Sequence, residues 1–175
     1  MFRIYNKIRR TGKVTEPFRL SDDQIVELGT ACQKEITRYF SGSLAIRMVD
    51  AGSCNGCELE MHAVNNSFYD IERFGIHFVA SPRHADLLLV TGVVSRHMQE
   101  ALKRTYAATP APKLVVAMGD CAGHGGEFGE SYASCGPVSN VIPVDAIIPG
   151  CPPTPVQLMQ GILQLLHQQG DETRS

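Results

Sequence analysis

Four cysteines of this 175-residue chain stand in segments where thiols could bind a metal or undergo redox chemistry. Cys54 and Cys57 form a C-x-x-C pair in "DAGSCNGCELE", Cys121 follows "MGD", and Cys151 lies in "PGCPPTP". The chain has six cysteines and no pattern typical of a secretory signal, so we expect its thiols to stay reduced. This favours metal or catalytic roles over a disulfide framework.

Three kinds of site fit the C-x-x-C pair taken alone. A redox dithiol uses such a pair between a strand and a helix, but it would leave Cys121 and Cys151 without a role. A zinc site usually takes its four ligands as two short pairs, and here Cys121 and Cys151 are 30 positions apart. A [4Fe–4S] cluster accepts thiolates from distant loops, and Cys followed by Pro recurs at such clusters. The spacing favours an iron–sulfur site and leaves the other two open.

Alternating strands and helices must position these cysteines. Continuous apolar runs predict buried parallel strands at 44–50, 76–81, 86–92 and 113–120, with a shorter one near 146–148. Apolar periodicity and capping residues predict helices at 21–40, 55–66, 97–108 and 154–170. The segment 121–153 reads as a long, Gly- and Pro-rich functional loop. The pattern predicts an α/β, doubly wound parallel sheet, in which ligands collect at the carboxyl ends of strands, where Cys54 and Cys121 fall.

Several other residues of these segments are candidates for supporting roles. Five loop glycines could let backbone approach a cluster closely, with ordinary loop positions as the alternative: Gly52, Gly56, Gly119, Gly123 and Gly150. Cys32 lies on the apolar stripe of the first helix and is interpreted as a small buried side chain. Cys135 is interpreted as a loop thiol. Four histidines are interpreted as structural or surface residues: His62, His84, His97 and His124.

Charge is distributed unevenly along the chain. The formal net charge of −2, with 43% hydrophobic residues, indicates one globular domain and argues against a nucleic-acid partner. Residues 1–19 nevertheless carry six Lys and Arg against Glu16, mixed with apolar side chains. This arm could lie on an anionic membrane surface or dock on a partner, with a solvated terminus as the alternative. No apolar run approaches the roughly 18 residues of a spanning helix, so we expect any membrane association to be peripheral.

Three motifs together resemble a known family. They are "VDAGSCNGCELE", "ERFGIHFVASPRHADLLLVTG" and "VIPVDAIIPGCPPTP", and they resemble the small-subunit family shared by [NiFe] hydrogenases and the 20 kDa subunit of respiratory complex I. The resemblance spans about Ile46 to Gly161. It implies a flavodoxin-like iron–sulfur domain at 44–170, a docking extension at 1–43 and a tail at 171–175. It also implies one [4Fe–4S] cluster, with these ligands: Cys54, Cys57, Cys121 and Cys151.

One departure selects a branch of that family. Complex I subunits have two adjacent cysteines where this chain has Cys54-Asn55-Gly56-Cys57, which is the hydrogenase form. With no further cysteine-rich segment before Ser175, the chain looks like the membrane-bound, energy-converting hydrogenases of the formate hydrogenlyase and carbon-monoxide-linked types. The resemblance implies a non-catalytic electron-relay subunit, held peripherally at the cytoplasmic side of the cytoplasmic membrane. The expected partners are a large subunit with a nickel–iron centre, a ferredoxin-like or polyferredoxin subunit, and membrane subunits.

Two alternatives and three supporting residues complete the expectations. The chain could serve a complex I-like quinone oxidoreductase without a nickel–iron site, or be a zinc-stabilised binding module. Glu58 and Glu60 lie two apart, hence on different helix faces, and one could face the cluster and take up a proton. The resemblance points to Glu60, and a solvated helix face is the alternative. Arg83 in "SPRHAD" could donate to cluster sulfur or to a large-subunit carboxylate, or form a structural salt bridge.

Overall fold

A five-stranded parallel sheet forms the centre of the computed structural model, which describes residues 6, 9–10 and 22–172. Most of the basic arm, Ser21 and the end of the predicted tail lie outside the described residues. The strands are β1 (Leu44–Asp50), β2 (Ile76–Phe78), β3 (Leu87–Thr91), β4 (Leu114–Met118) and β5 (Ala146–Ile148). Their order is β2-β1-β3-β4-β5, which is the flavodoxin-like order, so the predicted fold class is confirmed.

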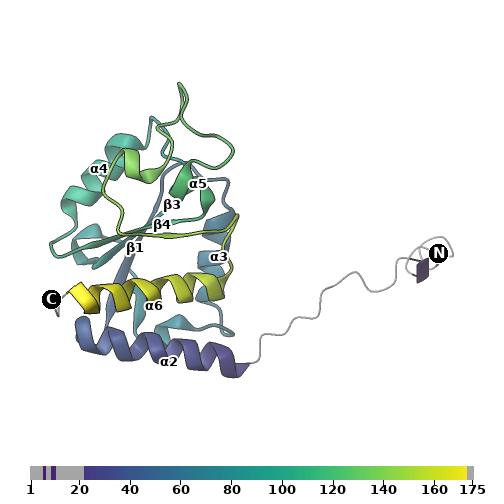
Figure 1. Cartoon of the computed structure of the whole chain (residues 1–175), viewed down its shortest axis with the longest axis vertical. Coiled ribbons are helices and arrows are strands. Elements are labelled where there is room, and N and C mark those ends of the chain that lie inside the picture. The colour runs from purple at the N-terminus through teal and green to yellow at the C-terminus, as the bar shows by residue number, and fades with distance from the viewer. Residues whose placement is uncertain (1–5, 7–8, 11–21, 173–175) are drawn as a thin grey trace.

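Helices cover both faces of the sheet. One apolar layer joins the sheet to α2 (Asp22–Tyr39), α3 (Gly56–Val64) and α6 (Pro155–Glu172), and the other joins it to α4 (Gln99–Ala108) and α5 (Asp120–His124). In Figure 1, α2 and α6 run side by side below the sheet, with α4 on the opposite side. Every residue of β3 and β4 is buried, which explains why these strands are continuously apolar in the sequence.

Two aspartates fix the register at the starts of neighbouring strands. The backbone N–H of Asp86 donates to Ala45 O, and the Ala45 N–H donates back to Asp86 Oδ2 at 2.9 Å. Asp145 forms the same reciprocal pair with Val115, whose N–H lies 2.7 Å from Asp145 Oδ2. These aspartates occur in the motifs "SPRHAD" and "VIPVDAII", so part of each motif serves the sheet.

The last helix begins as predicted, with the Thr154 hydroxyl accepting from Gln157 N–H and the Gln157 side chain accepting from Thr154 N–H. The prediction that it ends at Gly170 is wrong, because α6 continues to Glu172.

The long loop predicted at 121–153 is also partly wrong. It contains most of α5 and a 3₁₀ turn, η3 (Val138–Asn140). An isolated bridge from Ser95 to Ser134 ties its middle to the domain, and a second one, Glu130 to Cys135, lies within the segment itself. Two further 3₁₀ turns, η1 (Ile71–Phe74) and η2 (Pro82–His84), flank the short edge strand β2.

A thiol cluster at the carboxyl edge of the sheet

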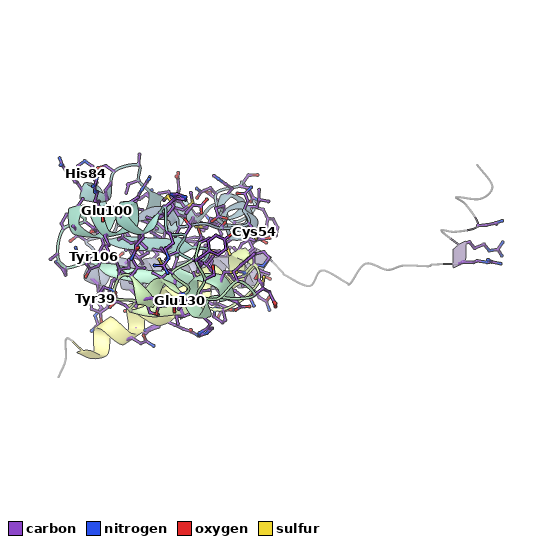
Figure 2. All side chains as sticks on the ribbon, turned by 90° about the horizontal axis from the view of Figure 1, so that it is seen from above. Tyr39, Cys54, His84, Glu100, Tyr106 and Glu130 are labelled. Carbon is purple, nitrogen blue, oxygen red and sulfur yellow. The ribbon has the colours of Figure 1, made fainter. Side chains whose placement is uncertain are left out.

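The four predicted cysteines all follow carboxyl ends of strands. Cys54 lies in the turn between β1 and α3, Cys57 in the first turn of α3, Cys121 in α5 directly after β4, and Cys151 in the loop after β5. Because the strands are parallel, these ends meet at one edge of the sheet. Figure 2 shows Cys54 at the opposite side of the domain from His84 and Tyr106.

The thiols are close enough to influence one another electrostatically. Burial, then the Glu58 carboxylate, then the other three thiols raise the pKa of Cys57 to about 12. Burial raises the pKa of Cys121 above its usual value, with Cys151 and Cys54 next among the causes. Cys54 and Cys151 are exposed, whereas Cys57 and Cys121 are half-buried. The site therefore has an inner and an outer pair of thiols.

Hydrogen bonds hold the C-x-x-C turn in place. Asp50 Oδ1, at the end of β1, accepts from the backbone N–H groups of Gly52 and Ser53 at 2.9 and 3.0 Å. The Ser53 hydroxyl accepts from Asn55 N–H at 2.8 Å, and Asn55 itself has φ 72°, a left-handed conformation that asparagine tolerates. The chain can thus turn sharply between the two cysteines.

A buried carboxylate supports this turn from below. Glu58 is 4% exposed and accepts hydrogen bonds from the hydroxyl groups of Ser53 and Thr91. Thr91 is the last residue of β3 and is completely buried. Glu58 therefore connects the ligand turn on β1 to the end of the neighbouring strand.

A third carboxylate connects the loops of the other two cysteines. Asp120 N–H donates to Gly150 O at 2.9 Å, and Gly150 N–H donates to Asp120 Oδ1 at 2.8 Å. Each residue directly precedes a candidate ligand, Cys121 or Cys151. This reciprocal pair fixes the separation of two thiols that are far apart in sequence.

Glycines leave room around the sulfur atoms. A Cβ added at Gly119 would lie 2.7 Å from Cys57 Sγ, and one added at Gly126 would lie 2.7 Å from Cys121 Sγ. At Gly56 it would lie 3.5 Å from Cys54 Sγ. Gly123, in contrast, faces Ile147, so its role is helix packing. A larger side chain at Gly119 or Gly126 would displace a thiol.

These observations fit the donor set of a [4Fe–4S] cluster. All six cysteines are free, and four thiols converge on one edge from three connections of the sheet. Within the described ranges, no three His, Cys, Asp or Glu side chains are grouped to hold a single metal ion. A four-iron cluster is larger and takes one thiolate per iron.

The remaining predicted residues are placed as follows. Glu60 lies toward Tyr69, whose pKa is raised by burial and then by Glu60, so of these two acids it is Glu58 that lies beside Cys57. Arg83 is exposed in η2, which lies with His84 across the domain from Cys54 in Figure 2. That placement favours a partner carboxylate over cluster sulfur for Arg83. Cys135 is buried against the other apolar layer, and the four histidines interpreted as structural or surface residues are exposed.

Sequence reasoning did not single out Asp50, Ser53, Thr91, Asp120 or Gly126. Three of them could have been found from the sequence, because each is a polar residue at or just after the end of an apolar strand. They are Asp50, Thr91 and Asp120. Ser53 and Gly126 carry no comparable signal in the sequence.

The fold and the thiol edge define a class of protein, a flavodoxin-like α/β domain with a four-cysteine site at the carboxyl ends of its strands. Residues 54–165 match the family model described as NADH ubiquinone oxidoreductase, 20 Kd subunit, and the chain belongs to this family. The match begins at the first candidate ligand and includes all four.

Individual relatives extend this result. The chain is 42% identical over 134 residues to a probable membrane-bound hydrogenase subunit of Pyrococcus furiosus, covering 77% of this chain and 80% of that one. It is 41% identical to formate hydrogenlyase subunit 7 of Escherichia coli over 83% of this chain, but it spans only 55% of that protein's length. It is 48% identical to a subunit of the F(420)H(2) dehydrogenase of Methanosarcina mazei over 62% of this chain and 59% of that one.

A solved structure supports the same fold. A chain of the membrane-bound sulfane sulfur reductase, an archaeal respiratory membrane complex, superposes with a TM-score of 0.65 at 38% identity, covering 74% of this chain and 71% of that one. In this chain, no helix of the described ranges has the length and apolar character needed to span a bilayer.

Proposed function

We propose that this chain is the electron-transfer subunit of a membrane-associated [NiFe] hydrogenase complex. Cys54, Cys57, Cys121 and Cys151 hold one [4Fe–4S] cluster, which accepts and donates single electrons when bound. The cluster passes electrons between ferredoxin-type clusters of a partner and a nickel–iron centre in the large subunit. The chain is held peripherally at the cytoplasmic side of the membrane by its partners.

One observation carries the proposal: four free thiols from separate connections of the sheet converge on one edge. A dithiol needs only Cys54 and Cys57 and does not explain why Cys121 and Cys151 join them. The C-N-G-C spacing and the names of two relatives, a membrane-bound hydrogenase subunit and a formate hydrogenlyase subunit, favour the hydrogenase branch.

The chain's own residues position the ligands and limit their motion. Asp50 and Ser53 shape the turn that carries Cys54 and Cys57, and Glu58 anchors this turn to β3. Asp120 accepts from Gly150 N–H and so keeps the loops of Cys121 and Cys151 together. A preorganised ligand set holds a cluster in one geometry as its charge changes, which suits electron relay.

Glu58 is the acid best placed to respond to that charge. It is buried and lies beside Cys57, whereas Glu60 lies toward Tyr69. We propose that the Glu58 carboxylate, with its two hydroxyl donors, sets the electrostatic environment of the cluster. Arg83 is assigned to contact a large-subunit carboxylate.

Anaerobic reconstitution with iron and sulfide tests the cluster. We expect about four irons and four sulfides per chain and an EPR signal after reduction. Serine substitution of Cys54, Cys57, Cys121 or Cys151 should each lower the iron content, whereas the matched variant Cys135→Ser should retain it. One zinc per chain and no sulfide would show a zinc-stabilised binding module instead.

A complex I-like module without a nickel–iron site is a second candidate. It is favoured by the family match to a 20 kDa NADH ubiquinone oxidoreductase subunit and by the relatives from an F(420)H(2) dehydrogenase and a sulfane sulfur reductase. The purified complex distinguishes the two. Stoichiometric nickel and hydrogen evolution with a low-potential electron donor support the hydrogenase, and their absence with retained quinone or sulfur reduction supports the alternative.

A further inference from the structure

Arg47 of β1 has a buried polar atom with no hydrogen-bond partner among the described residues. Its Nε is shielded from solvent and has no hydrogen-bond acceptor within the described part of the chain. The two ion pairs among the described residues involve other arginines, Arg38 and Arg104. An unpaired buried donor costs about 1 to 3 kcal/mol, and more when it belongs to a charged group. Buried polar groups of native proteins are nearly always hydrogen-bonded, so this guanidinium needs an explanation.

The guanidinium borders a cleft at the edge of the sheet. β2 pairs with β1 only as far as Ile46, while β1 continues to Asp50, so the edge is open beyond that point. There a cavity of about 240 Å³ is lined by Arg47, Met48, Met61, His62, Phe78 and Val79, among others. Among the described residues that line it there is no Asp or Glu, so their one permanent charge is positive.

The size and lining of the cleft indicate which kind of chemical group would fit it. Its volume is below the roughly 300 to 1,000 Å³ of sites for larger organic ligands. Its walls are mainly Met, Phe, Val and Ala, against which a free hydrated anion gains little. A carboxylate on an aliphatic stem fits both features, because the stem packs against the walls while the carboxylate accepts from the terminal N–H groups of Arg47, which are not among the buried atoms.

The position of the cleft indicates that this carboxylate comes from another protein. The cleft lies along α3, the helix that begins next to Cys57, and the exposed residues Leu59 and His62 lie three apart on that helix. Leu59 is 60% exposed, which is high for a leucine beside a functional site. An apolar residue and a cationic cleft on one helix face form a compact docking element.

We propose that this cleft is a socket for an Asp or Glu side chain of a partner subunit, which pairs with Arg47. The proposal rests on the proposed function only in requiring that the chain works within a multi-subunit complex. It adds the chemistry of the contact, which is a single ion pair in the cleft at the open edge of the sheet.

The test uses the complex purified through a tag on this chain, with the fraction of partner bound measured across a dilution series. Arg47→Met removes the charge and the donors, and should weaken association about 30-fold or more, since truncating one member of a buried charge pair costs 2 kcal/mol or more. Arg47→Lys should recover part of the loss. The matched control is Arg104→Met, which removes an exposed guanidinium paired with Glu100 on α4 and should change little.

A second variant keeps the proposal testable if Arg47→Met fails to fold. Ala80 is exposed and lines the cleft, so Ala80→Phe fills the socket while leaving Arg47 in place. It should weaken association as well. Wild-type association of either folded variant overturns the proposal. Iron content is measured separately: an iron-free wild type contradicts the proposed function, whereas unchanged association contradicts only the socket.

Discussion

Gly126 and Gly129 form a matched pair for testing whether Cys121 is held for a cluster. Their φ angles are nearly equal, +50° and +53°, so alanine meets the same backbone restriction at both positions. They differ in what a new methyl group would touch. At Gly126 it meets Cys121 Sγ at 2.7 Å, and at Gly129 it meets nothing within 4 Å.

The two effects can be separated by magnitude. An L-residue in the left-handed region costs about 1 kcal/mol, which is expected for both variants. Unstrained contacts between carbon atoms lie near 3.5 to 4.0 Å, so the methyl at Gly126 is too close to Cys121 by almost 1 Å. Overpacking of this kind costs about 1 to 3 kcal/mol. Gly126→Ala should therefore lose about 2 to 4 kcal/mol of unfolding free energy, against about 1 for Gly129→Ala.

The difference should appear more strongly in metal content. The chain can relieve the contact at Gly126 by turning the Cys121 thiol away, and this would remove one of four ligands. We expect Gly126→Ala to take up clearly less iron on anaerobic reconstitution, and Gly129→Ala to match the wild type. Urea unfolding of the iron-free chains supplies the stability values. Equal iron uptake and equal stability of the two variants would refute the argument that this glycine makes room for a ligand.

Three further perturbations address the supporting structure. Thr91→Val removes one donor to buried Glu58 and should destabilise the chain by about 2 kcal/mol in urea, whereas Thr105→Val, at a helix-surface hydroxyl, should cost little. Asp120→Ala should lower iron uptake, and Asp120→Asn, which keeps an acceptor for Gly150 N–H, should lower it less; equal losses would contradict the pairing. Burial raises the pKa of Cys32 from 9.0 to about 12. The buried neutral thiol therefore contributes fully to the free energy of unfolding below about pH 9, and this contribution is lost as pH rises toward 12. Relative to Cys32→Ala, wild type should lose up to about 1.4 kcal/mol more per pH unit in that window, measured from urea midpoints.

The parts of the fold that were predictable are those in which a buried run is long enough to reveal its period. β3 and β4 lie between two layers of helices, and their unbroken apolar runs identify them as central parallel strands. In contrast, α5 has five residues, Asp-Cys-Ala-Gly-His, and shows no period. It begins directly after β4, at the N-cap Gly119, and local propensity gives no sign of it.

The residues of the candidate site also fall into those that could be predicted from the sequence and those that could not. The four cysteines could be recognised by type and by their places after strands, and the structure brings those thiols to one edge. The choice between Glu58 and Glu60 could not be made from spacing, which shows only that they lie on different faces. It depends on Thr91, a donor 33 residues away that reaches Glu58 because β3 lies beside β1. Hydrogen bonds between residues so far apart in sequence can be predicted only after the order of the strands in the sheet is known.

Three carboxylates with different partners explain how loops so rich in glycine hold the four cysteines in place. Asp50 accepts within its own turn, Glu58 reaches the neighbouring strand, and Asp120 reaches the loop of the last ligand. The last two of these bonds join residues 33 and 30 positions apart in sequence, so together the three carboxylates connect all the ligand segments to the sheet. The inner thiols, Cys57 and Cys121, are half-buried, while Cys54 and Cys151 are exposed. We therefore expect an electron-transfer partner to approach from the side of the exposed pair, where no element of the described fold intervenes.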